Sequence, residues 1–288
     1  MASEFRHQTA DVNGIRLHWV VAGSGPPVFL LHGFPEFWYA WRHQIPALSE
    51  RYTVVAPDLR GYGYSDKPAG GYDKRTMAAD VKELAALLGY RQIAVVGHDR
   101  GARVGLRLAR DHPSLVARLA VLDNVPTKVI FDEMNGPLAA GQWWFLFNRV
   151  PGLPEALIAG REEIWLRYFF TTWAVNPQLM TQADLAEYVR AYAQPGAVSG
   201  ACNDYRAAPQ DLEQDAEDGD APIGCPVLAL WGEDFEWVGQ AYDVAAIWGR
   251  IAPDLRTVAL PGCSHLPHEE QPDKVSAELL EFLRDWAG

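Results

Sequence analysis

Short apolar runs and helix-like segments alternate along the first 125 residues of the chain. Residues 15–21, 28–31, 54–56, 93–96 and 119–122 predict strands. Two helices are expected between them. One follows Thr76, a candidate N-cap, because Met77, Val81, Leu84 and Leu88 recur at helical spacing before Gly89, and the other covers residues 102–109. This alternation is typical of a mostly parallel, doubly wound sheet with helices on its faces.

The pattern changes between about residues 126 and 220, where aromatic residues gather in helical stretches such as 142–147 and 164–173. Strand-like runs return at 227–231 and 257–260, before a final amphipathic helix over 275–286. We therefore predict a core domain of residues 1–125 and 221–288 and an inserted helical cap of residues 126–220. Most of the cap's aromatic residues are expected to pack it onto the core. The acidic run 211–220, with six carboxylates, is predicted to be a solvated loop.

Composition narrows the possible partners and location. The 288 residues carry a formal net charge of −12, which argues against nucleic acid or an acidic membrane as a partner. Three widely spaced cysteines give neither a disulfide framework nor a metal-site signature. The polar N-terminus lacks the apolar stretch of a signal peptide, and no apolar run is long enough to span a bilayer. The sequence favours a cytoplasmic protein without a metal or organic cofactor.

The pentapeptide from Gly97 to Gly101 has the layout of a nucleophile elbow, with Asp99 where serine commonly stands. It lies between a predicted strand and a predicted helix, as that motif requires. An aspartate there can displace a leaving group from saturated carbon and form an alkyl ester that water then hydrolyses. This chemistry points to alkyl halides or epoxides as substrates.

The ester needs a base to activate water, and the chain order of this fold places that histidine near the C-terminus. His265 follows a predicted turn and is preferred over His268, which could be a surface residue beside two glutamates. A carboxylate must orient the base. Asp123 and Asp234 both follow strands and both remain candidates, with Asp123 preferred because it directly ends its strand.

Arg100 and Arg103 are unusual at the start of a helix, because the helix dipole already makes that end electropositive. A substrate carboxylate is one expected partner, held in a bidentate fork, and a salt bridge to an acid of the cap is the alternative. The backbone N–H groups of Phe34 and Arg100 are predicted to form an oxyanion hole. His98 is expected to be a structural residue of the elbow.

Together these residues resemble the α/β-hydrolase superfamily along nearly the whole chain, and within it the fluoroacetate or haloacetate dehalogenases. The segments that carry the resemblance are 98–103, 122–127 and 265–270. It implies that Asp99 is the nucleophile, that Arg100 and Arg103 bind the haloacetate carboxylate, and that Asp123 and His265 complete the triad. It also implies a homodimer.

The same resemblance implies a halide site in the cap. The segment 203–207 matches the family's tyrosine segment at Tyr205, and the family's His-Trp pair aligns with Gln142 and Trp143. Glutamine in place of histidine is a departure that bears on the preferred halogen. Residues 32–41 also look like those of many epoxide hydrolases, which generally place tryptophan rather than arginine after the nucleophile.

We therefore expect a hydrolase that converts a short 2-haloacid into the 2-hydroxyacid and halide. Trp143, Tyr205 and Gln142 would hydrogen-bond the departing halide. The enzymatic alternative is an epoxide hydrolase with the same nucleophile and base, in which Tyr205 and Tyr168 would protonate the epoxide oxygen. A noncatalytic small-molecule binding protein on the same scaffold is a third hypothesis, which the presence of nucleophile, base and acid disfavours.

Overall fold

The computed structural model describes residues 5–288, and its centre is one eight-stranded sheet. The strands run β1 (Arg6–Val12), β2 (Ile15–Ala22), β3 (Pro27–Leu31), β4 (Thr53–Pro57), β5 (Ile93–His98), β6 (Val116–Leu122), β7 (Val227–Gly232) and β8 (Leu255–Leu260). Their spatial order is β1-β2-β4-β3-β5-β6-β7-β8. The first two pairings are antiparallel and the other five are parallel, so the predicted mostly parallel sheet is confirmed.

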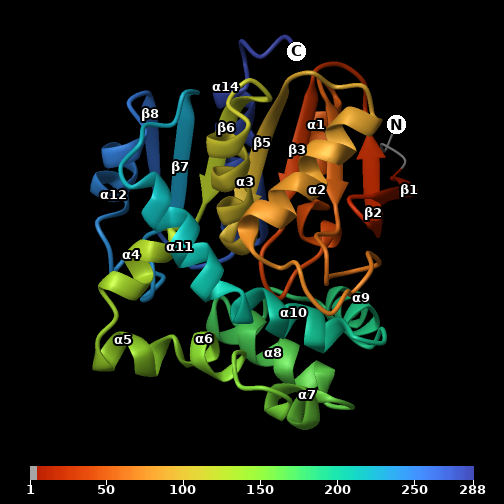
Figure 1. Cartoon of the computed structure of the whole chain (residues 1–288), viewed down its shortest axis with the longest axis vertical. Helices are drawn as coiled ribbons and strands as arrows, with labels where there is room; N and C mark the ends of the chain where they lie inside the picture. Colours follow the sequence, from red (N-terminus) through yellow and green to blue (C-terminus); the bar gives the residue numbers. More distant parts are fainter. Residues whose placement is uncertain (1–4) are drawn as a thin grey trace.

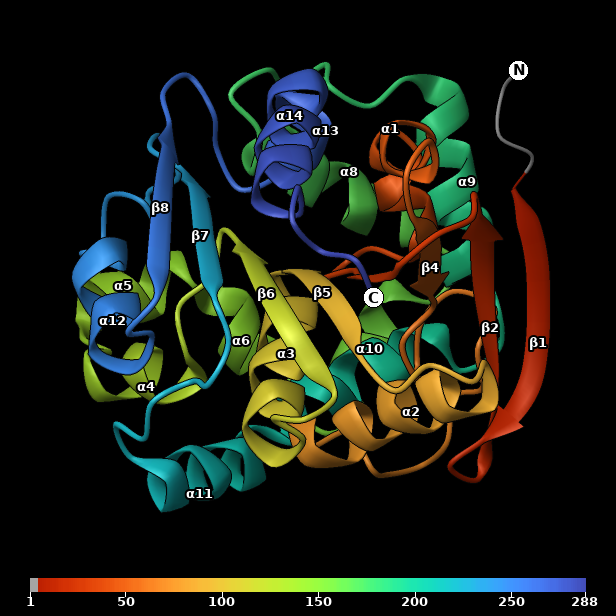
Figure 2. The same cartoon turned by 90° about the horizontal axis from the view of Figure 1, so that it is seen from above.

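Helices cover both faces of this sheet (Figure 2). On one face lie α2 (Lys74–Leu87) and α3 (Asp99–Asp111), and on the other lie α1 (Gln44–Ser49), α13 (Pro267–Glu270) and α14 (Pro272–Phe282). The short helix η1 (Trp38–Trp41) precedes α1, and α12 (Val244–Ile251) packs beside β7 and β8. Strands β3, β5 and β6 are almost wholly buried, as expected for parallel strands covered on both faces.

The chain between β6 and β7 forms helices, most of which lie beyond the ends of the parallel strands in Figure 1. The last of them, α11, lies beside α3 (Figure 2). They are α4 (Thr127–Asp132), α5 (Gly136–Gly141), α6 (Trp143–Phe147), α7 (Leu153–Ile158), α8 (Glu162–Thr172), α9 (Gln182–Tyr192), α10 (Ala197–Arg206) and α11 (Ala208–Asp218). We call this segment the cap. Parallel strands end at the edge that faces it, and open α/β sheets bind ligands at that edge.

Several expectations from the sequence need correction. The run 211–220 is not a solvated loop, because α11 covers most of it and Asp218 pairs with Arg107 and Arg110 of α3. Basic partners on a neighbouring helix offset the repulsion on which that prediction rested. The N-cap of α2 is Asp73, which accepts a hydrogen bond from Thr76 N–H, and not Thr76 itself. Strand β1 was not predicted, and residues 1–4 of the polar N-terminus lie outside the described residues.

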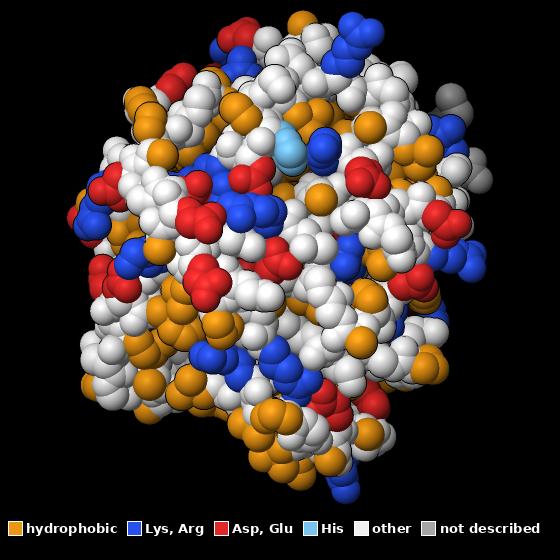
Figure 3. All heavy atoms as spheres, viewed as in Figure 1, with side chains coloured by type: hydrophobic (Ala, Val, Ile, Leu, Met, Phe, Trp, Pro, Cys, Tyr) orange, Lys and Arg blue, Asp and Glu red, His pale blue; other side chains and the backbone are white. Residues whose placement is uncertain are grey.

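Large exposed hydrophobic side chains gather on the cap. Seven of the nine found in the described chain are Leu146, Val150, Leu153, Leu157, Ile164, Tyr168 and Val175. In Figure 3 hydrophobic side chains cluster at the end where Figure 1 places α7. The homodimer stays a prediction. Within residues 5–288, no helix combines the length and the apolar character needed to cross a bilayer.

The start of α3 lies against the end of β3 so closely that a side chain does not fit. A Cβ atom at Gly101 would lie 2.1 Å from the carbonyl oxygen of Leu31. We expect Gly101→Ala to lower the free energy of unfolding by about 1–3 kcal/mol or more, measured by urea denaturation. Gly249→Ala is the matched control. It lies exposed in α12 with open space around it, and should stabilise by about 0.5–1 kcal/mol. Equal changes in the free energy of unfolding for Gly101→Ala and Gly249→Ala would contradict this explanation.

Candidate active site

The elbow between β5 and α3 projects Asp99 toward the cap. Asp99 has φ of 43°, in the left-handed region that non-glycine residues rarely adopt, so the turn is held by its surroundings. One carboxylate oxygen, Oδ2, accepts a hydrogen bond from Phe34 N–H at 3.1 Å. Asn124 Nδ2 donates to the Asp99 carbonyl oxygen at 3.0 Å. The nucleophile is thus fixed by the ends of β3, β5 and β6.

His265 and Asp123 form a buried pair at the same edge. His265 Nδ1 lies 2.6 Å from Asp123 Oδ2, and Gly232 N–H donates to Asp123 Oδ1 at 3.1 Å. Burial raises the pKa of Asp123, while its hydrogen bond to His265 opposes that rise. The His265 ring stacks on Phe235 and meets Trp173 edge-on. These contacts hold Nδ1 on the acid and leave Nε2 for the chemistry.

Both alternatives that the sequence left open are placed elsewhere. Asp234 is exposed, and its backbone N–H donates to the carbonyl oxygen of Cys263. The carboxylate that reaches His265 is that of Asp123. His268 is not a surface residue. It is fully buried, and its Nε2 lies 2.9 Å from Glu36 Oε1. Its ring therefore belongs to a buried hydrogen-bonded cluster with Glu36 and does not face Asp99.

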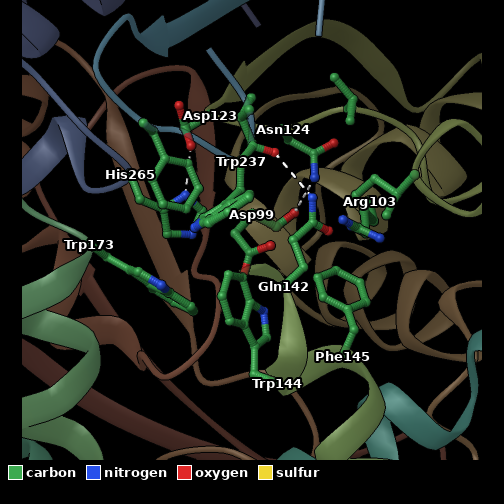
Figure 4. A pocket seen from close by; sticks show the side chains of 14 residues that line it. Asp99, Arg103, Asp123, Asn124, Gln142, Trp144, Phe145, Trp173, Trp237 and His265 are labelled. Carbon is green, nitrogen blue, oxygen red and sulfur yellow. Dashed lines mark hydrogen bonds and ion pairs between the residues drawn. The ribbon is translucent and has the colours of Figure 1, made fainter. Parts of the chain in front are cut away.

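Asp99 lines a small cavity of about 20 Å³, room for about one water molecule. Figure 4 shows Asp99 between the His265–Asp123 pair and Arg103, with Trp144 and Phe145 of the cap close by. Asn124, Gln142, Trp173 and Trp237 also line the cavity. A larger hollow of about 410 Å³ adjoins it and shares Trp144, Trp173, Phe235 and Trp237 as a common wall.

The two arginines differ sharply. The guanidinium of Arg100 is paired with Asp204 of α10, with Nε 3.0 Å from Oδ2 and Nη2 2.6 Å from Oδ1. Arg100 does not line the cavity, so its predicted role as a ligand of the substrate carboxylate needs correction. Arg100 instead forms the alternative contact expected from the sequence, a salt bridge to an acid of the cap. The sequence could not show this pairing, because 104 residues separate the partners.

Arg103 lines the cavity and has no ion-pair partner within the described chain. Its Nη1 donates to Thr127 Oγ1 at 2.9 Å, and its Nε is buried without a hydrogen bond. Burial and the charge of nearby Arg100 lower the pKa of Arg103. A buried guanidinium with one neutral partner is a ready binding site for an anion.

The halide residues are brought together only in part. Gln142 lines the cavity, with Nε2 3.4 Å from the Trp237 carbonyl oxygen and Oε1 unpartnered. Trp143 lies outside it, where its Nε1 donates to Tyr168. Trp144 lines the cavity instead. Successive helical residues point about 100° apart, so one of these tryptophans turns away from the cavity.

Tyr205 lies close to the nucleophile without lining the small cavity itself. Its ring packs edge-on against Phe34 and Phe145, and the Arg100 guanidinium lies 4.5 Å from the ring centre. Burial first, and then the nearby charge of Asp99, raise the pKa of Tyr205 well above its usual value. The hydroxyl therefore stays protonated as a hydrogen-bond donor. Tyr168 is exposed and faces the outer hollow.

Of the two backbone groups predicted to form the oxyanion hole, the Phe34 N–H has a defined contact with Asp99, and the Arg100 N–H stays a prediction. Phe34 N–H already points at the Asp99 carboxylate. Arg100 lies in the first turn of α3, where backbone N–H groups have no partner inside the helix. Both groups can donate to an oxygen of the Asp99 carboxyl group when it carries negative charge. The roles of all these residues remain predictions that their placement supports.

Three buried residues near the site are of the types that bind metal ions. The potential ligand atoms of Glu36, His98 and His268 lie within 4.8 Å of one another. However, both Glu36 oxygens accept hydrogen bonds from imidazole nitrogens, and the second nitrogen of His98 faces a carbonyl oxygen. Only His268 Nδ1 is left without a partner among the described residues, and the other ligand atoms face one another in hydrogen bonds, so the cluster is better described as a hydrogen-bonded unit.

Comparisons with known proteins agree with this fold. The family described as the alpha/beta hydrolase fold matches residues 26–272. The chain is 39% identical to a soluble epoxide hydrolase of Corynebacterium sp. (strain C12), over 98% of this chain and 99% of the relative. It is 36% identical to a fluoroacetate dehalogenase of Burkholderia sp, over 99% and 96%. A solved structure of an alpha/beta hydrolase from Nostoc sp PCC 7120 superposes with a TM-score of 0.94 at 41% identity, over 98% and 99%.

The different surroundings of the two arginines predict opposite effects on stability. Arg100→Met would leave Asp204 short of its main counter-charge in a buried place, so we expect a loss of about 3–5 kcal/mol in the free energy of unfolding. Arg103→Met removes a buried cation that has no carboxylate partner, so its effect should be near zero or stabilising. Urea denaturation of both variants measures this. A large loss for Arg103→Met would show that a partner has been overlooked.

Proposed function

The chain belongs to the α/β-hydrolase family, and from that premise we propose that it hydrolyses a short 2-haloacid to the 2-hydroxyacid and halide. Asp99 attacks the α-carbon, and the halide leaves with the bonding electron pair. His265 then takes a proton from water, and the resulting hydroxide attacks the carbonyl carbon of the Asp99 ester. Phe34 and Arg100 N–H groups stabilise the oxyanion. Its collapse breaks the ester C–O bond, the leaving oxygen takes up a proton to give the hydroxyacid, Asp99 is restored as a carboxylate, and His265 releases its proton to water.

The observation that carries this proposal is the unpaired charge of Arg103. Before reaction, the Asp99 carboxylate offsets that charge across the cavity. When Asp99 becomes an ester, it loses its negative charge, and the buried guanidinium would be left without a counter-ion. A substrate that carries a carboxylate supplies the missing charge throughout the life of the ester. A neutral epoxide brings no carboxylate. When its ring opens, the negative charge passes to the donor that gives up its proton, such as Tyr205, and not to a substrate carboxylate held by Arg103.

The leaving halide would be bound by donors from the cap. Trp144 Nε1, the Gln142 amide and the Tyr205 hydroxyl are the groups available near Asp99. Trp144 replaces Trp143 in this role, because the Nε1 of Trp143 is directed to Tyr168.

An epoxide hydrolase remains the second candidate, because the relative at 39% identity carries that name and Tyr205 is a protonated donor near Asp99. Tyr168 is too exposed and too far into the outer hollow to be the second donor that the sequence suggested. Tyr205, together with Gln142 or Trp144, would then have to donate to the epoxide oxygen as the ring opens.

A substrate panel separates the two functions. We expect halide release from fluoro-, chloro- and bromoacetate, and little turnover of a neutral haloalkane or an epoxide. Arg103→Gln should lower kcat/KM for haloacids by about 10- to 150-fold, the loss of a charge-assisted contact worth about 1.5–3 kcal/mol. The same variant should not lower epoxide turnover, which is the internal control. Preferred turnover of the epoxide, with haloacids inactive, would replace this proposal with the alternative.

Gln142 sets the expected halogen preference. Fluoride is a poor leaving group, and a neutral amide offers it a bond about half as strong as a cationic imidazole would. We expect the wild type to favour chloro- or bromoacetate over fluoroacetate, and Gln142→His to shift the ratio of kcat/KM values toward fluoride. Kinetics on both substrates for both proteins measure the ratio. An unchanged ratio would mean that residue 142 does not contact the leaving group.

A further inference from the structure

We propose that His98 is a permanently protonated positioning residue, which together with Glu36 holds the loop of the base His265 against the nucleophile elbow. His98 directly precedes Asp99, yet its side chain points away from the cavity and into the protein, where it is fully buried. This role goes beyond the proposed function, since it is needed for ester hydrolysis whether the ester comes from a haloacid or an epoxide.

Glu36 is the centre of the arrangement. It is fully buried, and its Oε2 accepts hydrogen bonds from Gly33 N–H at 2.8 Å and from His98 Nδ1 at 2.8 Å. Its Oε1 lies 2.9 Å from His268 Nε2. One carboxylate therefore ties together the turn that carries Phe34, the elbow that carries Asp99 and the helix α13 that follows His265.

The charge of His98 follows from its two partners. Nδ1 faces the Glu36 carboxylate, and Nε2 lies 2.7 Å from the backbone carbonyl oxygen of His265. A carbonyl oxygen can accept but not donate, so Nε2 must carry a hydrogen. Gly33 N–H and the His268 ring also donate to Glu36 and stabilise its ionised form, so the carboxylate has no hydrogen to give and Nδ1 must carry one too. Because both ring nitrogens are protonated, His98 is an imidazolium.

The charged groups around His98 agree with this assignment. The carboxylates of Glu36, Asp99 and Asp123 face it, as do the rings of His265 and His268. Burial opposes the charge, but the nearby Glu36 carboxylate outweighs it and raises the pKa of His98 to about 9. The pKa of Glu36 is held well below its usual value by the two histidines. Burial lowers the pKa of His268 to about 4, so its ring is neutral.

The consequence concerns the second half of the reaction. The His98 imidazolium gives the His265 backbone a charge-assisted hydrogen bond, roughly twice as strong as a neutral one. That bond sets the distance between the base and the Asp99 ester, and a shift near 1 Å can cost about 100-fold in rate. In the first step Asp99 attacks the substrate, Arg103 and the donors of the cap bind it, and the base takes no part. This step should therefore depend little on His98.

The resting enzyme tests the charge without any substrate. Nitrogen-15 NMR of ring-labelled histidine should show one side chain with both nitrogens protonated that does not titrate until the pH approaches about 9. His98→Gln should remove that signal, and Glu36→Gln should convert it to a neutral ring. A His98 that is neutral at about pH 7, or that titrates near the ordinary histidine pKa of about 6.5, would overturn the proposal.

Single-turnover kinetics test the positioning role. With a haloacetate, His98→Gln should slow hydrolysis of the Asp99 ester by about 10- to 100-fold and change its formation little, so that the ester accumulates and intact mass detects it. His18→Gln is the matched control. His18 is also a buried imidazole, 2.7 Å from the Asp58 carboxylate, but it lies outside the cavity that Asp99 lines. It should lower stability without separating the two steps.

Equal slowing of hydrolysis in both variants would show that His98 acts through general stability, and the positioning role would be wrong. Failure of every haloacid and epoxide to alkylate Asp99 would instead remove the proposed function. In that case the NMR result still decides the charge of His98, because it needs no substrate.

Discussion

The buried ion pair between Arg100 and Asp204 is the interaction on which the site depends. Arg100 directly follows Asp99, and Asp204 belongs to the cap, so their pairing joins the core to the cap next to Asp99. Neither charge could be buried alone, since an unpaired ion costs several kcal/mol in such surroundings. Lys74 and Tyr62 of the core also bind Asp204. The next residue, Tyr205, is thereby fixed beside Asp99, and Arg103 is left as the cation without a carboxylate partner.

A second constraint acts at the edge of the sheet. Strands β3, β5 and β6 are neighbours and parallel, so their ends bring the Phe34 turn, Asp99 and Asp123 to one place. Asp99 and Asp123 both have positive φ, which turns their side chains out of line with the strands. Such backbone conformations persist where tight packing determines them, as where α3 meets β3 at Gly101.

The sequence predicted the features that local patterns encode. Apolar runs located seven strands of the sheet, and the elbow motif with the residues after strands located Asp99, Asp123 and His265. Predictions failed where partners distant in sequence decide the outcome. Arg100 is paired with Asp204, and basic residues of α3 pair with α11. His268 is buried, where it is paired with Glu36. Trp144 was missed because the break between α5 and α6 determines which tryptophan faces inward, and sequence spacing does not fix that phase.

The arrangement also explains why similarity alone does not name the substrate. Relatives at 39% and 36% identity carry the names of an epoxide hydrolase and a fluoroacetate dehalogenase, so the shared fold serves both chemistries. In the mechanism we propose, Asp99, His265 and Asp123 would perform the same two steps on either ester. The two chemistries would differ in the charge that must be balanced after Asp99 is alkylated and in the donors that bind the leaving group. Arg103 on α3 is the residue we propose for the first, and Gln142 and Trp144 at the start of α6 are those we propose for the second. On this proposal, substrate choice depends on the boundary between core and cap, where a few side chains can change it without disturbing the sheet.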